Sequence, residues 1–292
     1  MTSNAREPLH SKHGTSTACL LLVLALVVEV GPEAAAQDAP ATVTAPPGSP
    51  PTSEPIQAPT VTPAPTPPAA QSAQSAQSAQ SAQPDDSNAQ VELLREGTVA
   101  LKAGDRQRAI SEYFDKVIAY YEARYKDNPA LVFSAQSPTQ ALLYAASGAG
   151  AKRDTLVLDA VWADSHLARA YALSELGRVE EARKDLEAAI ALSPMSSQYL
   201  SELAYTYQLD RNWEASLDQY RKAAGAADMS AEASRNADLG RAWRGEAYGL
   251  VELGKLDEAQ ALYQKCLQLD RNDGKARNEL EYIRELRKKT HP

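Results

Sequence analysis

The sequence of 292 residues is poor in the residue types that most often carry chemistry. It holds two cysteines, four histidines and two phenylalanines. If an N-terminal leader is removed, Cys266 is the one cysteine left, which excludes an intramolecular disulfide. His166 and His291 are then the remaining histidines, and they do not have the spacing of metal ligands. We therefore expect no metal site and no cofactor.

Basic residues are also scarce relative to acidic ones. The chain has 30 Lys and Arg against 38 Asp and Glu, and its formal net charge is −8. Nucleic-acid-binding proteins carry clustered Lys and Arg, and no such stripe is present here. The carboxylates lie at the spacings of solvated helix faces. A nucleic-acid partner is therefore not expected.

Long apolar runs are limited to residues 18–28, ACLLLVLALVV. This run is shorter than the roughly 20 residues that a membrane-spanning helix needs. A polar leader with Arg6 and Lys12 precedes it and Ala34-Ala35-Ala36 follows it, which is the pattern of a secretory signal peptide. We expect residues 1–36 to be that signal, and no membrane span after its cleavage.

Cysteine use supports export to a bacterial periplasm. Cys19 opens the apolar run instead of following it, so we do not expect a lipid on it. Cys266 lies in a helical pattern at a position for small residues, where a cysteine is more often core than reactive. An exported chain without a disulfide framework must fold through packing alone.

Residues 37–90 differ sharply from the rest of the chain. They contain no Lys or Arg, few large apolar residues, many prolines and a run of Ser-Ala-Gln repeats. Such a segment cannot bury enough apolar surface to offset its chain entropy, so we expect it to be disordered. It is either a passive tether or a spacer that presents the following domain.

From Val91 onward, apolar residues recur at helical spacing, and we expect residues 91–292 to be all-α. The stretch 155–161, TLVLDAV, is the one ambiguous piece. Residues 126–162 fit no regular unit, although 138–146 suggest a short helix and 148–151 a turn. Residues 274–289 form a further amphipathic helix.

Within the helical part, two segments have similar sequences: ELGRVEEARKDLEAAIAL at residues 175–192 and ELGKLDEAQALYQKCLQL at residues 252–269. Units near residues 163–196, 197–230 and 240–273 carry small residues at their eighth, twentieth and twenty-seventh positions. These residues are Ala170, Ala182 and Ala189, then Ala204, Ser216 and Ala223, then Ala247, Ala259 and Cys266. A weaker unit lies near 90–123, with Gly97, Gly104 and Ala109.

This pattern resembles the tetratricopeptide repeat (TPR) family, whose unit has about 34 residues and forms a helical hairpin. The resemblance implies a superhelix of stacked hairpins, with residues 274–289 as the capping helix. Gly177 and Gly254 can adopt the backbone angles that end a first helix. Arg211 replaces this glycine in the second unit, and Lys116 breaks the small-residue rule in the weak unit. The last two units start nine residues farther apart than one period, and we expect the extra residues around 225–238.

Catalysis is not expected. Asp164, Ser165 and His166 are neighbours on one predicted helix, so they do not face one another as a triad would. The stretch GAGAKRDT near Lys152 lacks the spacing and the preceding strand of a phosphate-binding loop. We therefore expect a non-enzymatic protein.

The resemblance implies a binding groove lined by the first helices of the units, with the ninth position of each pointing into it. Tyrosine occupies this position in all three units. Tyr and Arg are enriched at binding hot spots, because they combine large area with directional donors. The candidate binding residues are Tyr171, Tyr205, Tyr248, Arg241, Arg244, Gln198 and Gln208. The alternative is that the tyrosines pack along the groove wall and touch only neighbouring units.

These features predict a protein–protein interaction adaptor or assembly factor of the cell envelope, which binds a peptide or a partner helix in the groove. A second possibility is a regulatory module of a cell-wall enzyme system that binds glycan strands or other ligands. A third is a mainly structural spacer.

Overall fold

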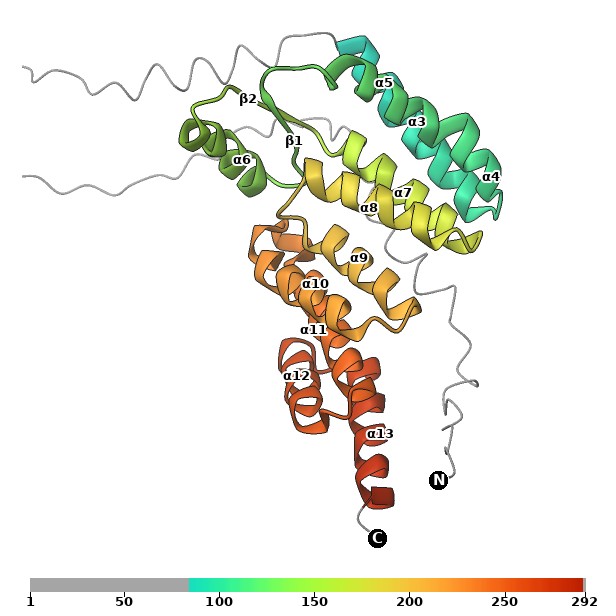
Figure 1. Cartoon of the computed structure of the whole chain (residues 1–292), viewed down its shortest axis with the longest axis vertical. Coiled ribbons are helices and arrows are strands. Elements are labelled where there is room, and N and C mark those ends of the chain that lie inside the picture. Colours follow the sequence, from blue (N-terminus) through green and yellow to red (C-terminus); the bar gives the residue numbers. More distant parts are fainter. Residues whose placement is uncertain (1–83, 291–292) are drawn as a thin grey trace, which may run out of the picture. The chain divides into compact units, whose positions relative to one another are not determined.

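The computed structural model describes residues 84–290, which form a stack of helical hairpins (Figure 1). The expected signal peptide, Cys19 and residues 37–83 of the expected linker lie outside the described residues. Helix α3 (Pro84–Lys102) begins before Val91, so the last part of the expected linker is helical. Within residues 84–290, no helix combines the length and apolarity of a membrane span.

Four hairpins follow one another along the chain. In the first, α3 is followed by α4 (Arg106–Arg108), the π-helical turn η2 (Ala109–Phe114) and α5 (Asp115–Tyr125). The others are α7 (Val161–Glu175) with α8 (Val179–Leu192), α9 (Ser197–Leu209) with α10 (Trp213–Ala226), and α11 (Glu232–Glu252) with α12 (Leu256–Leu269). The helix α13 (Gly274–Thr290) closes the stack. The mostly helical repeat array is therefore the predicted fold.

Small residues let the two helices of each hairpin approach closely. Ala182, Ala189, Ala204 and Ala223 are completely buried, and Cys266 is 1% exposed. A larger side chain at these positions would push the helices apart. The repeat positions that the sequence singled out are thus the contact line inside each hairpin.

The turns inside the hairpins share one backbone conformation. Gly104, Gly177 and Gly254 have positive φ angles of 87°, 75° and 73°. Arg211 occupies the same place in the third hairpin with φ 57°, although a side chain is unfavourable there. The repeat geometry therefore prevails over the local preference of arginine.

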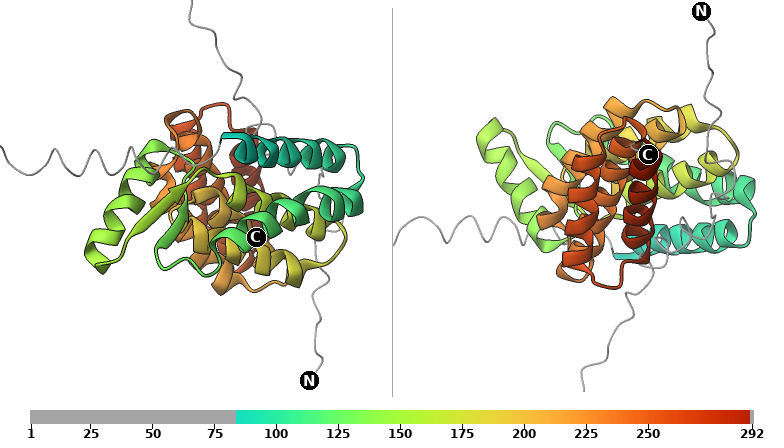
Figure 2. Two further views of the ribbon diagram at one scale, coloured as in Figure 1. Left: turned by 90° about the horizontal axis from the view of Figure 1, so that it is seen from above. Right: turned by 90° about the horizontal axis from the view of Figure 1, so that it is seen from below.

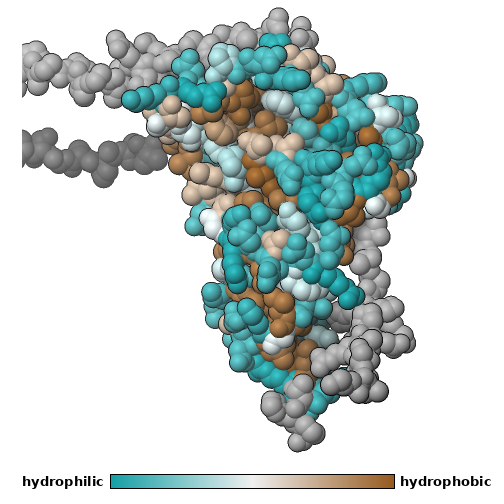
Figure 3. Space-filling view, viewed as in Figure 1, coloured by the Kyte–Doolittle hydropathy of each residue, from teal (hydrophilic) through white to brown (hydrophobic). Residues whose placement is uncertain are grey.

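Neighbouring hairpins bury a shared apolar layer. α8 packs on α9, α10 on α11, and α12 on α13, and Figure 2 shows the last two helices side by side at the C-terminal end. One apolar cluster joins Leu217 of α10, Leu250 of α11, Tyr263 of α12 and Ile283 of α13. The face seen in Figure 3 is mostly hydrophilic, with apolar residues in patches. Burial between neighbouring units therefore adds to the burial inside each hairpin and joins the units into one stack.

Residues 131–158 depart from the all-helical expectation and are called the insert below. The strands β1 (Leu131–Ser134) and β2 (Thr155–Leu158) pair in parallel, with Leu131 opposite Thr155, and α6 (Pro138–Ala151) connects them. α6 includes residues 148–151, which we expected to form a turn. Ser137 caps this helix and Pro138 opens it, while Gly148 lets Thr155 approach closely.

Two local features explain irregularities of the repeat. The π-helical turn η2 absorbs an extra residue, so the buried side chain at the contact line of the first hairpin is Val117, while Lys116 is exposed. The extra residues expected around 225–238 form the short helix η3 (Ala227–Met229) and the first turns of the long α11.

Candidate functional site

The first helices of the repeat units carry a row of tyrosines, which we call the first-helix face. Tyr171 of α7, Tyr205 of α9 and Tyr248 of α11 hold the ninth position of their units. Tyr282 of α13 follows Tyr248 by one repeat length and takes the equivalent position. Tyr282 was not among the predicted binding residues, because residues 274–289 were expected to form only a capping helix.

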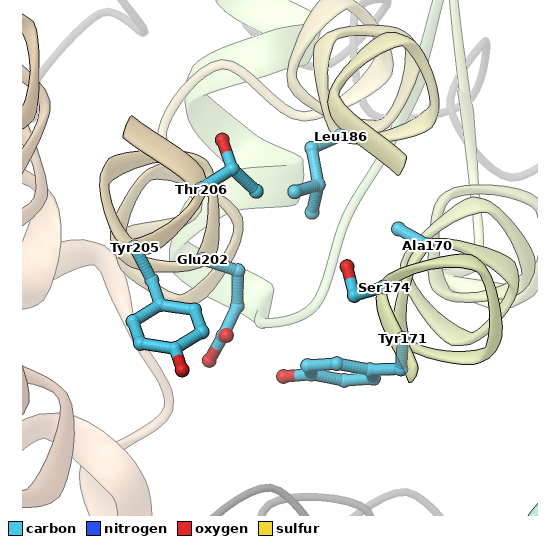
Figure 4. Close-up of a pocket in the computed structure, with 7 residues that line it drawn as sticks. All are labelled: Ala170, Tyr171, Ser174, Leu186, Glu202, Tyr205 and Thr206. Carbon is cyan, nitrogen blue, oxygen red and sulfur yellow. The ribbon is translucent and has the colours of Figure 1, made fainter. Parts of the chain in front are cut away.

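A small pocket opens on this face between α7, α8 and α9 (Figure 4). It is lined by Ala170, Tyr171, Ser174, Leu186, Glu202, Tyr205 and Thr206. In this view the Glu202 carboxylate lies between the tyrosine rings of α7 and α9. Glu202 was not among the predicted residues, although it precedes Tyr205 by about one helical turn and this spacing places both on one side of α9.

The carboxylate in the pocket is held in a low-polarity environment. Burial raises the pKa of Glu202, and Arg241 of α11 and the Tyr171 hydroxyl counteract that rise. The guanidinium of Arg241 forms its ion pair with Asp238, with Nη1 and Oδ1 3.2 Å apart. Burial, followed by the charge of Glu202, raises the pKa of Tyr171 well above its ordinary value. The pocket therefore places a carboxyl group and a tyrosine hydroxyl together in a shielded environment.

A second cluster of the same kind lies on α11 and α13. Burial raises the pKa of Tyr248, and the next contributions come from Glu252, Glu279 and Tyr282. Burial, Glu252 and Glu279 likewise raise the pKa of Tyr282. Trp213 borders this cluster, with its ring 6.0 Å from the Tyr248 ring at 65°. Tyrosines and carboxylates thus lie together at two places on the first-helix face.

Of the other predicted binding residues, one lies near the pocket and two form hydrogen bonds between helices. Gln198 lies close enough to the Tyr171 hydroxyl to lower the pKa of that tyrosine. Gln208 donates from Nε2 to the Gly245 carbonyl at 3.0 Å and so connects α9 with α11. Arg244 donates to Asp273 at 2.6 Å, at the beginning of α13.

The structure therefore brings together Tyr171, Gln198, Tyr205 and Arg241 around Glu202. Tyr248 belongs to the second cluster. Gln208 and Arg244 connect helices inside the stack.

Asp164, Ser165 and His166 point to different partners. Ser165 donates to the Val161 carbonyl at 2.7 Å, and His166 Nδ1 lies 2.8 Å from Asp185 of α8. Burial opposes ionisation of Asp185, but hydrogen bonds from His166 and Arg169 outweigh it and lower the pKa of Asp185. This buried network joins α7 to α8 and has no triad geometry. Residues 84–290 also contain no group of His, Cys, Asp and Glu that could hold a metal ion.

The fold of the described residues defines the class: a mostly helical repeat protein. The family model described as "Tetratricopeptide repeat" matches residues 163–194 and 243–273. These two segments match tetratricopeptide repeats, and the described residues form a mostly helical repeat array. The comparisons identify no catalytic domain, and no curated protein matches the sequence.

Several solved structures resemble the chain. The Pseudomonas aeruginosa pilF structure is 13% identical, covers 70% of this chain and 71% of its own, and has a TM-score of 0.48. The second TPR domain of human RPAP3, in complex with an HSP70 peptide, is 21% identical and covers 42% of this chain and 94% of its own, with a TM-score of 0.37. The N-terminal domain of C. elegans STI-1 is 14% identical and covers 43% and 96%, with a TM-score of 0.38.

Proposed function

We propose that the protein is an exported adaptor or assembly factor of the cell envelope that binds a peptide or a partner helix on its first-helix face. The observation that carries this proposal is the row of tyrosines on successive first helices, with Glu202 between two of them. Tyrosine gives a large contact area at low cost in side-chain entropy and also offers a hydroxyl for hydrogen bonding. Export to the periplasm rests on the leader, the apolar run and the alanines of residues 1–36.

The geometry favours a ligand that lies across several units. Tyr205 and Tyr248 are half-buried, so part of each ring remains available to a ligand. Tyr171, in contrast, is only 5% exposed and serves as the floor of the pocket. An extended peptide or a helix can contact such a row, because successive side chains of the ligand then meet successive units.

The test is a pair of substitutions at the half-buried tyrosines. With Tyr205→Ala and Tyr248→Ala combined, we expect the partner that is captured from the native cell to be lost, with binding weakened roughly a hundredfold. Capture by a photo-crosslinking residue in place of Tyr205 identifies that partner by mass spectrometry. Fractionation of the same cells tests the location, since the proposal requires a periplasmic chain that begins at Gln37.

Tyr207→Ala is the matched control. Tyr207 is a half-buried tyrosine of α9, but it lies against Arg183, 4.6 Å from the guanidinium carbon to the ring centroid. Its removal should leave partner capture unchanged. Circular dichroism shows whether the double variant keeps its fold. If it does and still captures the same partners, the tyrosines only pack against neighbouring units and the proposal is wrong. Crosslinking to a glycan instead of a protein would support the regulatory-module alternative.

A further inference from the structure

The strand β2 of the insert has one edge without a partner. In the parallel ladder Leu131 lies opposite Thr155, and the Leu131 N–H donates to the Asp154 carbonyl at 2.8 Å. Because alternate residues of a strand face opposite neighbours, the backbone N–H and C=O groups of Thr155 and Val157 point away from β1. Within residues 84–290 no hydrogen bond is made to these groups. They remain available to another strand.

The composition of β2 suits pairing with such a strand. Its sequence TLVL combines strand-favouring residues with no charge. Edge strands are usually protected from pairing by a lysine, a proline or a bulge, and residues 155–158 contain none of these. β1 packs against α7 and α8, whereas β2 packs mainly against β1 and α6, and Figure 1 shows the insert at the side of the hairpin stack. The edge of β2 is therefore accessible.

This edge is complementary to itself. When two β2 strands run antiparallel, the open backbone groups of Thr155 in one copy meet those of Val157 in the other, and Leu156 lies opposite its own copy on a two-fold axis. The same register places Arg153 of one copy opposite Asp159 of the other. Both residues are exposed, so opposite charges meet at both ends of the paired strands.

Arg153 and Asp159 are not committed to other charges. Arg153 donates to the Pro129 carbonyl at 2.8 Å, and Asp159 accepts from the Val161 N–H at 3.1 Å. Neither forms an ion pair with another of the residues that the structure describes. An ion pair between copies therefore replaces no ion pair within one copy.

The helix of the insert allows the two copies to approach. α6 lies over both strands, since the Tyr144 ring stacks 4.8 Å from Phe133 of β1 and Gly148 lets Thr155 of β2 come close. A two-fold axis perpendicular to the sheet keeps both α6 helices on one face, two strand spacings or about 10 Å apart. Helices pack at roughly 8–10 Å, and residues 129–151 contain no charged side chain to oppose this contact.

We propose that two copies of the chain pair through β2, so that their two-stranded sheets join into one continuous sheet with both α6 helices on the same face. Backbone hydrogen bonds join the copies at the centre, and the pairs of Arg153 with Asp159 fix the register. The contact uses none of the residues of the first-helix face. It is therefore independent of the adaptor function, and it gives the assembly two such faces.

Sedimentation equilibrium of the full chain, as its cells produce it, tests the pairing, and we expect a concentration-dependent dimer. Val157→Pro removes an N–H that points to the partner and keeps the ladder to β1, so it should raise the dimer dissociation constant roughly tenfold or more. Val132→Pro is the matched control, because it removes an N–H from the opposite edge of the same sheet. It should leave the dimer intact.

An exchange of charges tests the register. Arg153→Asp and Asp159→Arg each place like charges opposite one another in their own dimers, which should weaken the dimers roughly tenfold. An equimolar mixture of the two variants restores opposite charges at both ends of the strands. The variants should then pair with each other about as tightly as the unaltered chain pairs with itself, which a misfolded variant does not do.

A monomer at every concentration, or an unchanged dimer in Val157→Pro, would overturn the proposal. A mixture of the charge variants that stays as weak as each variant alone would also overturn it. If both proline variants lose the dimer, the mixture decides. The adaptor function stands in each case, because its test depends on Tyr205 and Tyr248.

Discussion

At the scale of single residues, Asp164 is a carboxyl group that the structure shields from solvent at the contact of the insert with α7 and α9. Its Oδ1 accepts hydrogen bonds from the Tyr199 hydroxyl at 2.6 Å and from Gln136 Nε2 at 3.3 Å. Burial raises the pKa of Asp164 to about 6, and the charge of Asp159 adds to that rise. The insert, α7 and α9 therefore meet at a carboxyl group that loses its proton near neutral pH.

The raised pKa predicts that folding stability falls as the pH increases through about 6. The folded state holds the Asp164 proton more tightly than the unfolded state, so protonation stabilises the fold and ionisation removes that contribution. Asp164→Asn should raise the free energy of unfolding at pH 8 by about 1–2 kcal/mol and leave it unchanged near pH 4. Urea titrations at several pH values measure this difference.

Asp127→Asn provides the control, since Asp127 is exposed on the segment after α5. It should shift the unfolding curves equally at every pH, if at all. A larger stabilisation by Asp164→Asn at pH 4 than at pH 8 would contradict the assignment.

At the scale of elements, the insert is fastened to the connections between hairpins. The hydroxyl of Tyr144 accepts from the Met195 backbone N–H at 3.0 Å and contacts Ser193 Oγ at 3.2 Å. Gln140 donates to the Met195 carbonyl at 3.1 Å, and Ser137 donates to the Met229 carbonyl at 2.7 Å. The insert thus supplies hydrogen-bond partners for partly buried backbone groups of these connections.

Tyr144→Phe removes the hydroxyl from this contact and keeps the ring, which stacks 4.8 Å from Phe133. The partly buried Met195 N–H would lose its partner, and we expect the free energy of unfolding to drop by about 1 kcal/mol. Chemical denaturation measures the loss. Tyr120→Phe on α5 tests removal of a hydroxyl outside the insert and should cost less. Equal losses in the two variants would mean that the Tyr144 hydroxyl does not fasten the insert.

The hairpins and the short helix of the insert could be predicted from the sequence, whereas the parallel strands of the insert could not, for a physical reason. Buried small residues at the twentieth position, Ala182, Ser216 and Ala259, recur in successive units, so the repeat can be recognised from the sequence. β1 and β2 have four residues each, too few to display a period, and their partners are distant in sequence. The tyrosines of the face were predicted from their position in the unit, but Glu202 needed the geometry of the folded pocket.

At the scale of the whole described array, contacts between neighbouring helices stabilise the fold. Ile283 of α13 is fully buried against the last hairpin, in the cluster that also holds Cys266 and Tyr263. Burial raises the pKa of the Cys266 thiol to about 11, which keeps it unreactive in the folded state. The reactivity of this thiol therefore reports how firmly α13 closes the array.

Ile283→Ala should loosen the C-terminal end without touching the first hairpin. A cavity of this kind costs about 2–5 kcal/mol. In a Cys19→Ser background, we expect Cys266 to react with Ellman's reagent at least tenfold faster than in the same chain with Ile283. Val99→Ala is the control, because Val99 of α3 is 55% exposed and its loss should leave the rate unchanged. An equal rate in both variants would show that α13 does not protect the thiol.

The hairpins have two unlike ends. The insert contacts the connections that join one hairpin to the next, at Met195 and Met229, whereas the tight turns at Gly104, Gly177, Arg211 and Gly254 belong to the other end. A dye, a spin label or an immobilising tag placed beside one of these turns would avoid the contacts that fasten the insert. The tight turns are accordingly suitable attachment sites for labels in binding experiments, because a label there leaves the first-helix face uncovered.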